Sequence, residues 1–130
     1  MPHELHTLAF TIILGLAHLM IATSFITKQR GLKWNLSPRD ETATPLTGIT
    51  ARLDRSYKNF METFVFFAAA VLLVHALQKH TEMAAVGALI YFAARVIYIP
   101  LYAFGIIGLR TLVWLVSLVG IAAVLASLVV

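Results

Sequence analysis

Cysteine is absent from the sequence, and charged residues are scarce. Of 130 residues, 12% are charged and 60% are hydrophobic, and the mean hydropathy is +0.87. The absence of cysteine excludes a disulfide framework, a thiol nucleophile and a thiolate metal site, and we expect no other metal site. Because about a quarter of the residues of a typical soluble domain are charged, the composition predicts an integral membrane protein.

The sequence also lacks a phosphate-cradling glycine loop, an internal repeat and a nucleic-acid-binding motif, so no nucleic acid partner is expected.

Four apolar runs are present, each near the roughly 20 residues that cross a hydrocarbon core. We predict one all-α domain over residues 1–130, an integral membrane four-helix bundle with helices at residues 5–27, 45–77, 83–104 and 109–130. The first run is too long for a secretory signal and lacks a basic start, so we expect it to be retained. Thr44 and Pro45 predict the start of the second helix, as N-cap and first helical residue.

Positive charge is concentrated in the first connection and the helix start after it. Seven of the ten Lys and Arg residues lie within residues 28–58, where the acids are Asp40, Glu41 and Asp54. The positive-inside rule therefore places the first and third connections in the cytoplasm and both termini on the opposite side. Trp34, in the same connection, suits the headgroup level of a membrane.

Polar side chains share one face of the second predicted helix within residues 52–62. At about 100° per residue, this face carries three cations, an amide and a carboxylate: Arg52, Arg55, Lys58, Asn59 and Glu62. One interpretation is a solvated basic collar at the start of a membrane helix. The other is a polar binding face that enters the membrane.

The third predicted helix contains one charge, Arg95, about nine residues from its end. Tyr91, Tyr98 and Tyr102 lie on the same narrow stripe of this helix. An interfacial belt of tyrosines would explain Tyr102 but not Arg95. Because charges inside a membrane normally pair or serve a site, we expect Glu62 to be the partner of Arg95.

Two further positions stand out in the remaining helices. Arg110 and Thr111 begin the fourth helix at the membrane boundary, on the same side as the two polar stripes. His18 stands alone in the first helix, with no His, Asp or Glu three or four positions away, and we expect a packed core residue there.

Together these residues resemble the signatures of the MAPEG family, the membrane-associated proteins in eicosanoid and glutathione metabolism. The resemblance spans roughly residues 52–114 and implies a left-handed four-helix protomer that assembles as a homotrimer among membrane lipids. It also implies a site between protomers, open to the cytoplasmic side, and a small bacterial member located in the inner membrane. The matching residues are Arg52, Arg55, Asn59 and Glu62, then Arg95, Tyr98 and Tyr102, then Arg110 with Thr111.

The resemblance further implies that glutathione is bound as cosubstrate. Its carboxylates and amino group would be held by the second-helix positions Arg52, Arg55, Lys58, Asn59 and Glu62. Arg95, Tyr98 and Tyr102 would complete the pocket, and a lipophilic substrate would enter from the bilayer. Catalysis would fall to Arg110, which stabilises the thiolate, and to Thr111. Three positions differ from other members of the family. They carry Lys58 in place of Arg, Tyr98 in place of His and Thr111 in place of Ser.

Three functions are compatible with this pattern. The first is a glutathione-dependent transferase or peroxidase that acts on lipophilic electrophiles. The second is a non-catalytic membrane scaffold or accessory subunit, in which Arg55, Asn59, Glu62 and Arg95 satisfy one another without leaving a cavity. The third is a small multidrug exporter, which the cations around Glu62 disfavour because they would repel cationic drugs.

Overall fold

The computed structural model describes residues 1–40 and 42–130, so Glu41 lies outside the described residues. Four long helices are present, α1 (His3–Arg30), α3 (Gly48–Ala76), α4 (Glu82–Ala103) and α5 (Ile107–Ala126), with a short helix α2 (Leu32–Asn35) after α1. Each long helix is sufficiently long and apolar to cross a membrane. The predicted all-α architecture with four membrane-spanning helices is confirmed.

Helix α3 begins later than the sequence predicted. Its N-cap is Thr47, not Thr44, and Gly48 follows with a φ of 60°. The Gln29 side chain holds Thr47 in place, since its Nε2 donates to the Thr47 carbonyl at 3.0 Å and its Oε1 accepts from the Thr47 N–H at 3.2 Å. The Thr44 carbonyl accepts a bond from Arg30 Nε at 2.9 Å. These contacts with the end of α1 hold this segment outside the helix, so the predicted start at Pro45 was wrong.

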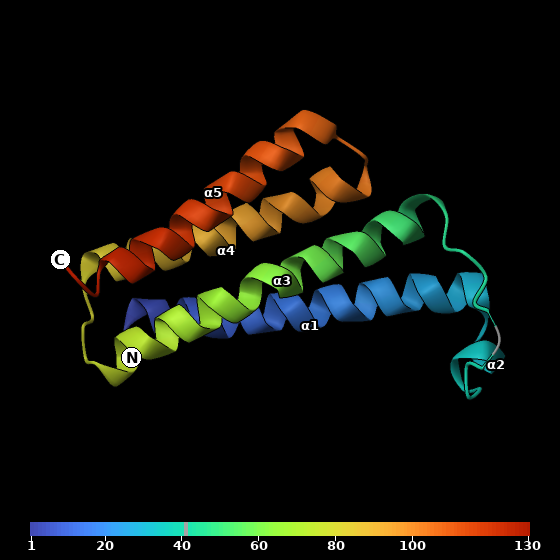
Figure 1. The fold of residues 1–130 in the computed structure, drawn as a ribbon, viewed down its shortest axis with the longest axis horizontal. Coiled ribbons are helices and arrows are strands. Elements are labelled where there is room, and N and C mark those ends of the chain that lie inside the picture. Colours follow the sequence, from blue (N-terminus) through green and yellow to red (C-terminus); the bar gives the residue numbers. More distant parts are fainter. Residues whose placement is uncertain (41) are drawn as a thin grey trace.

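The long helices form two antiparallel pairs, α1 with α3 and α4 with α5 (Figure 1). The pairs lie close together where the two termini and the α3–α4 connection meet, which we call the closed end. The opposite end, at α2 and the α4–α5 turn, we call the open end. There α3 still contacts α4, because Arg52 Nε donates to the Ala103 carbonyl at 2.7 Å. Helices α4 and α5 touch most closely at Gly87 and Gly120, where a Cβ on Gly120 would lie only 2.7 Å from the Gly87 carbonyl oxygen.

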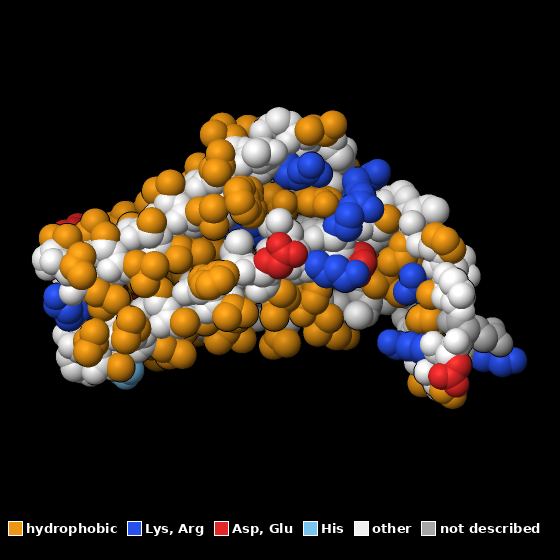
Figure 2. Space-filling view, in the orientation of Figure 1, with side chains coloured by type: hydrophobic (Ala, Val, Ile, Leu, Met, Phe, Trp, Pro, Cys, Tyr) orange, Lys and Arg blue, Asp and Glu red, His pale blue; other side chains and the backbone are white. Residues whose placement is uncertain are grey.

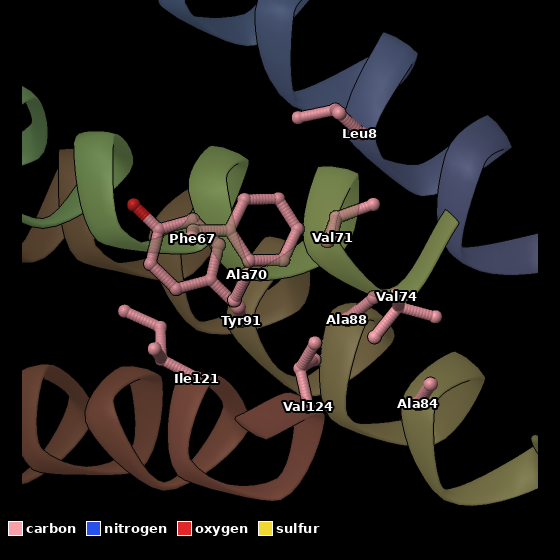
Figure 3. Close-up of a cluster of buried hydrophobic side chains, with 10 residues drawn as sticks. All are labelled: Leu8, Phe67, Ala70, Val71, Val74, Ala84, Ala88, Tyr91, Ile121 and Val124. Atoms are coloured by element: carbon pink, nitrogen blue, oxygen red, sulfur yellow. The ribbon is translucent and has the colours of Figure 1, made fainter. Parts of the chain in front are cut away.

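The hydrophobic core lies between the two helix pairs (Figure 3). At its centre the rings of Phe67 and Tyr91 stack with their centroids 4.2 Å apart, and the Tyr91 hydroxyl hydrogen bonds with Thr63 at 2.9 Å. The ten residues of the cluster are Leu8, Phe67, Ala70, Val71, Val74, Ala84, Ala88, Tyr91, Ile121 and Val124. Many large apolar side chains remain exposed outside this core, as expected for helices that face lipid.

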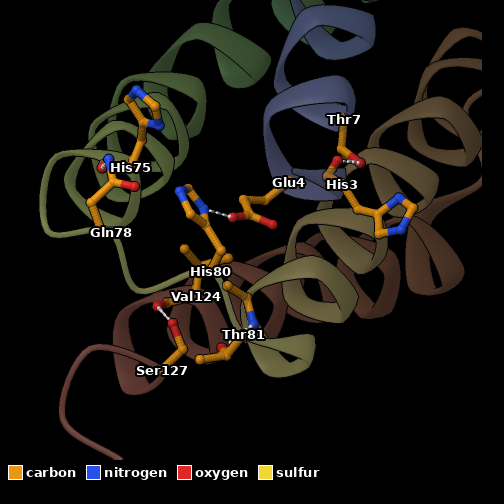
Figure 4. A network of polar contacts seen from close by, with 10 residues as sticks. His3, Glu4, Thr7, His75, Gln78, His80, Thr81, Val124 and Ser127 are labelled. Carbon is orange, nitrogen blue, oxygen red and sulfur yellow. Dashed lines mark hydrogen bonds and ion pairs between the residues drawn. The ribbon is translucent and has the colours of Figure 1, made fainter. Parts of the chain in front are cut away.

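The α3–α4 connection fastens the closed end. His80 Nδ1 contacts the buried Glu4 carboxylate at the start of α1 (Figure 4), and Lys79 Nζ donates to the Leu128 carbonyl after α5 at 2.6 Å. Thr81 then caps α4, because its hydroxyl oxygen accepts a bond from the Ala84 N–H at 3.2 Å. Three successive residues thus fasten α1, α4 and α5 at the closed end.

Candidate functional site

A row of hydrogen bonds joins α3 to α4 from the core toward the open end. On α3 the bonded residues are spaced by about one helical turn, so one face of this helix meets α4. The bonded pairs are Thr63 with Tyr91 (2.9 Å), Asn59 with Arg95 (3.1 Å), Arg55 with the Tyr102 hydroxyl (3.3 Å) and Arg52 with the Ala103 carbonyl (2.7 Å).

Arg95 is the most deeply buried of the predicted site residues, with only 1% of its surface exposed. Its Nη1 donates to Asn59 Oδ1, and its Cζ lies 4.2 Å from the Tyr98 ring centroid and 5.7 Å from that of Phe60. An amide and two aromatic faces therefore surround the guanidinium. The expectation that Glu62 pairs with Arg95 was wrong.

The orientation of α3 explains the different partner. This helix turns Phe60, Thr63 and Phe67 inward. Glu62 lies two residues after Phe60, or about 200° around the helix axis, and is exposed. It makes no ion pair or side-chain hydrogen bond with the described residues. A carboxylate at this depth would face lipid unless another surface covered it.

A pocket of about 230 Å³ lies beside this row of bonds, between α3, α4 and α5. The Tyr98 and Tyr102 ring centroids lie 5.5 Å apart, and the Arg110 guanidinium lies over the Tyr102 ring, with Cζ 4.5 Å from its centroid. The structure thus brings five predicted site residues together around one space. The lining residues are Asn59, Tyr98, Tyr102, Arg110, Thr111 and Trp114.

The other predicted residues surround this pocket without lining it. Arg55 reaches it through Tyr102, and Arg95 lies behind Asn59 and Tyr98. Arg52 donates to the last carbonyl of α4, which satisfies a helix C-terminus. Lys58 is exposed and forms an ion pair with Asp54 at 2.9 Å within the same helix. Its ammonium group is therefore not directed into the pocket.

Sequence reasoning missed Trp114, which forms part of the pocket wall. A signal was available, because Trp114 follows Arg110 by four residues and such residues lie on the same face of a helix. Its indole N–H is buried and has no hydrogen-bond partner among the described residues.

His18 packs in the core behind the pocket, as predicted. Only 1% of its surface is exposed, and its ring meets Tyr57 edge-on with the centroids 5.5 Å apart. It also lies against Phe60, with the centroids 6.2 Å apart. His18 and Arg95 therefore contact the same phenylalanine from α1 and α4.

Charge gathers at the open end. Figure 2 shows Lys and Arg side chains close to acidic ones toward this end, whereas most of the remaining face is hydrophobic. The charged surface lies next to four helices that are long and apolar enough to cross a membrane. A polar ligand from solution and an apolar ligand from the bilayer could therefore meet here.

The sequence model of the MAPEG family matches residues 7–130. The chain belongs to the MAPEG family. The resemblance noted over residues 52–114 is thus confirmed and extends over nearly the whole chain. None of the curated proteins compared with the chain matches it. In this MAPEG protein, most of the residues that carried the resemblance lie in the row of bonds between α3 and α4 or in the pocket beside it.

Proposed function

We propose that this protein is a glutathione-dependent transferase or peroxidase that acts on lipophilic electrophiles at the cytoplasmic side of the membrane. The observation that supports this function is the pocket that collects Asn59, Tyr98, Tyr102, Arg110 and Thr111. Glutathione has two carboxylates and an ammonium group, so its site needs fixed cations and at least one anion. Arg55, Arg110 and Glu62 provide these charges around the pocket.

The pocket of one protomer is too small for the whole ligand. Its volume of about 230 Å³ is below the roughly 300–1,000 Å³ of typical small-molecule sites. Glu62 and Lys58 are exposed on the same protomer, and an exposed carboxylate in a membrane-spanning helix is costly. A second copy placed against this surface would enlarge the site and cover Glu62. We therefore propose the homotrimer that the family resemblance implies, with the site between protomers.

The proposed chemistry depends on a thiolate. The thiol proton of glutathione passes to water, and the sulfur attacks the electrophilic carbon of the lipophilic substrate. A carbon–sulfur bond forms as the bond from that carbon to its leaving group breaks, and the leaving group departs with the electron pair. Arg110, at the start of α5 and partly buried, favours the charged sulfur. Thr111 and the Tyr102 hydroxyl are further hydrogen-bond donors beside the same space. In the peroxidase alternative the same thiolate attacks a hydroperoxide oxygen, the O–O bond breaks, and the alcohol leaves after taking up a proton. A second glutathione thiol then converts the resulting sulfenic acid to glutathione disulfide and water.

Isothermal titration calorimetry in mild detergent, combined with a mass measurement of the assembly, tests the proposal. We expect the trimer to bind glutathione at millimolar concentration or below. Arg55→Ala should weaken binding at least tenfold, since a hydrogen bond to a charged group contributes about 1.5–3 kcal/mol. Lys79→Ala removes a cation at the closed end and serves as the control. No binding by an intact trimer would refute the enzymatic function, and a stable monomer or dimer would refute the shared site.

A scaffold that uses the same charges as a structural lock is the second candidate, and the Arg95–Asn59 and Arg52–Ala103 bonds favour it. It would require the polar residues to satisfy one another without a cavity. Instead, Asn59 borders a pocket and Glu62 has no partner among the described residues. These observations support ligand binding over a purely structural role.

A further inference from the structure

The lobe formed by α2 lies outside the bundle, at the open end of α1 (Figure 1). Gly31 has a φ of 91°, a conformation that side chains other than glycine rarely adopt, and it separates α2 from α1. Asn35 Nδ2 donates to Thr27 Oγ1 at 2.6 Å, which fastens the end of α2 back onto α1. The lobe is therefore held at the membrane boundary that α1 defines.

A pocket of about 550 Å³ lies in this lobe. The guanidinium groups of Arg30 and Arg39 both lie against the Trp34 ring, with Cζ 5.0 and 5.1 Å from its centroid. Each is also anchored by a backbone carbonyl, Arg30 Nε by Thr44 at 2.9 Å and Arg39 Nη2 by Asn35 at 3.3 Å. Two cations are thus positioned around one indole, and their remaining N–H groups have no hydrogen-bond partner among the described residues. The lining residues are Arg30, Lys33, Trp34, Ser37, Pro38, Arg39 and Asp40.

The lining is rich in hydrogen-bond donors and in positive charge. Arg30, Lys33 and Arg39 outnumber Asp40, and none of these four residues forms an ion pair with the described residues. The indole N–H of Trp34 is buried and has no partner among the same residues. Arginine forks and a lysine match the several acceptor oxygens of a phosphate group.

The surroundings of the pocket indicate where such a phosphate would come from. Leu32 and Leu36 follow each other by four residues and are 63% and 78% exposed, so they form an apolar face on the lobe. An amphipathic element beside a membrane-spanning helix places such a face in the bilayer and its cations at the headgroups. Tryptophan is also typical of this level.

We propose that this pocket binds the phosphate of an anionic phospholipid in the leaflet next to the open end. Leu32 and Leu36 enter the acyl region, and Arg30, Lys33 and Arg39 surround the headgroup. The site is separate from the pocket between α3, α4 and α5, and its occupation does not depend on whether glutathione binds there.

Native mass spectrometry of the purified full chain tests this site with phosphatidylglycerol and phosphatidylcholine of identical acyl chains. The wild type should bind phosphatidylglycerol more tightly than phosphatidylcholine. Lys33→Gln and Arg39→Gln should each lower the affinity for phosphatidylglycerol about fivefold, the contribution expected of one cation near an anionic surface. Lys79→Gln removes the same charge at the closed end and should change nothing. Circular dichroism checks that each variant keeps its helices.

A second measurement tests the depth of the lobe. In a Trp114→Phe background, Trp34 is the only tryptophan, and lipids brominated near the headgroup should quench its fluorescence more than lipids brominated at the chain ends. Equal binding of the two lipids would overturn the proposal. Displacement of phosphatidylglycerol by millimolar inorganic phosphate would assign the site to a soluble anion, and loss of oligomers instead of lipid in Arg39→Gln would assign it to a protein contact. Either outcome also overturns it.

Discussion

At the scale of residues, the central feature of the site is the buried guanidinium group of Arg95. Arg95 is almost fully buried, and its hydrogen-bond acceptor among the described residues is the amide of Asn59. Removing one partner of a buried charged group costs more than removing both, because the remaining charge is left without compensation. This asymmetry gives a test that requires no ligand.

Asn59→Leu should lower the free energy of unfolding by about 1.5–3 kcal/mol, the contribution of a hydrogen bond to a charged group. The double variant Asn59→Leu with Arg95→Met should be more stable than the sum of the two single effects predicts, because both polar partners are then replaced by apolar groups. Thermal unfolding in detergent measures all four proteins. Strict additivity would contradict the pairing.

Arg110 is the residue that we expect to control reactivity. A cation beside the bound glutathione thiol lowers the pKa of that thiol, so Arg110→Ala should raise it. A rise of one to two units, at about 1.4 kcal/mol per unit, would leave roughly ten- to a hundredfold less thiolate near neutral pH. Most of the affinity for glutathione should remain, since Arg55 stays beside the pocket through Tyr102 and Arg95 still holds Asn59 in its wall.

The thiolate in this experiment is followed by its ultraviolet absorbance as the pH is varied. Arg110→Lys keeps the positive charge and serves as the control, with a smaller shift expected. An unchanged titration in Arg110→Ala would move the role to Thr111 or Tyr102, the neighbouring hydroxyls of the pocket. An equally large loss of binding would make Arg110 an anchor for the peptide.

At the scale of elements, the contact between α4 and α5 depends on two glycines. A Cβ on Gly120 would lie 2.7 Å from both the Gly87 carbonyl oxygen and the Tyr91 backbone nitrogen. Small residues allow such close approach of helices in membranes. Because the obstructing atoms belong to the backbone, the two helices would have to move apart to accept a methyl group.

Gly120→Ala should therefore destabilise the protein by about 1–3 kcal/mol through overpacking. The gain in helix propensity from glycine to alanine, about 1 kcal/mol at most, acts in the opposite direction. Gly108→Ala in the same helix is the matched control, since no atom lies within 4 Å of its added Cβ, and it should be neutral or stabilising. A stabilising Gly120→Ala in chemical unfolding would show that α4 and α5 can separate freely.

At the scale of the whole molecule, the closed end decides how the two helix pairs meet. The Glu4 side chain is 2% exposed and its partner His80 is 24% exposed. The pair connects the start of α1 to the loop between α3 and α4, and Lys79 extends the connection to the end of α5. Without these contacts, the apolar core and the hydrogen bonds between α3 and α4 would still link the two pairs.

His80→Ala should lower the free energy of unfolding by about 1.5–3 kcal/mol, the contribution of a hydrogen bond to a charged group, because the buried Glu4 carboxylate loses its contact with His80. His75→Ala is the control. The His75 ring lies 5.5 Å from that of His80 but makes no side-chain hydrogen bond with the described residues. Equal unfolding midpoints for the two variants would show that the Glu4 contact contributes little to stability.

Much of the architecture could be predicted from the sequence because it depends on local rules. The composition indicated an integral membrane protein, and the lengths of the apolar runs indicated four membrane-spanning helices. The helical repeat placed Tyr98 and Tyr102 on the stripe of Arg95, and the structure shows both rings beside the pocket. The start of α3 could not be predicted in this way, because Gln29 and Arg30 of another helix hold the residues before it.

The sequence by itself determined which side chains share a helix face, since each residue advances about 100° around the axis whatever surrounds the helix. It could not determine how each helix is rotated within the bundle, which depends on the packing of side chains distant in sequence. Packing of Phe60, Thr63 and Phe67 turned Asn59 toward Arg95 and left Glu62 outside. Only the tertiary structure therefore decided that the buried guanidinium bonds an amide and that the carboxylate remains exposed on the protomer surface.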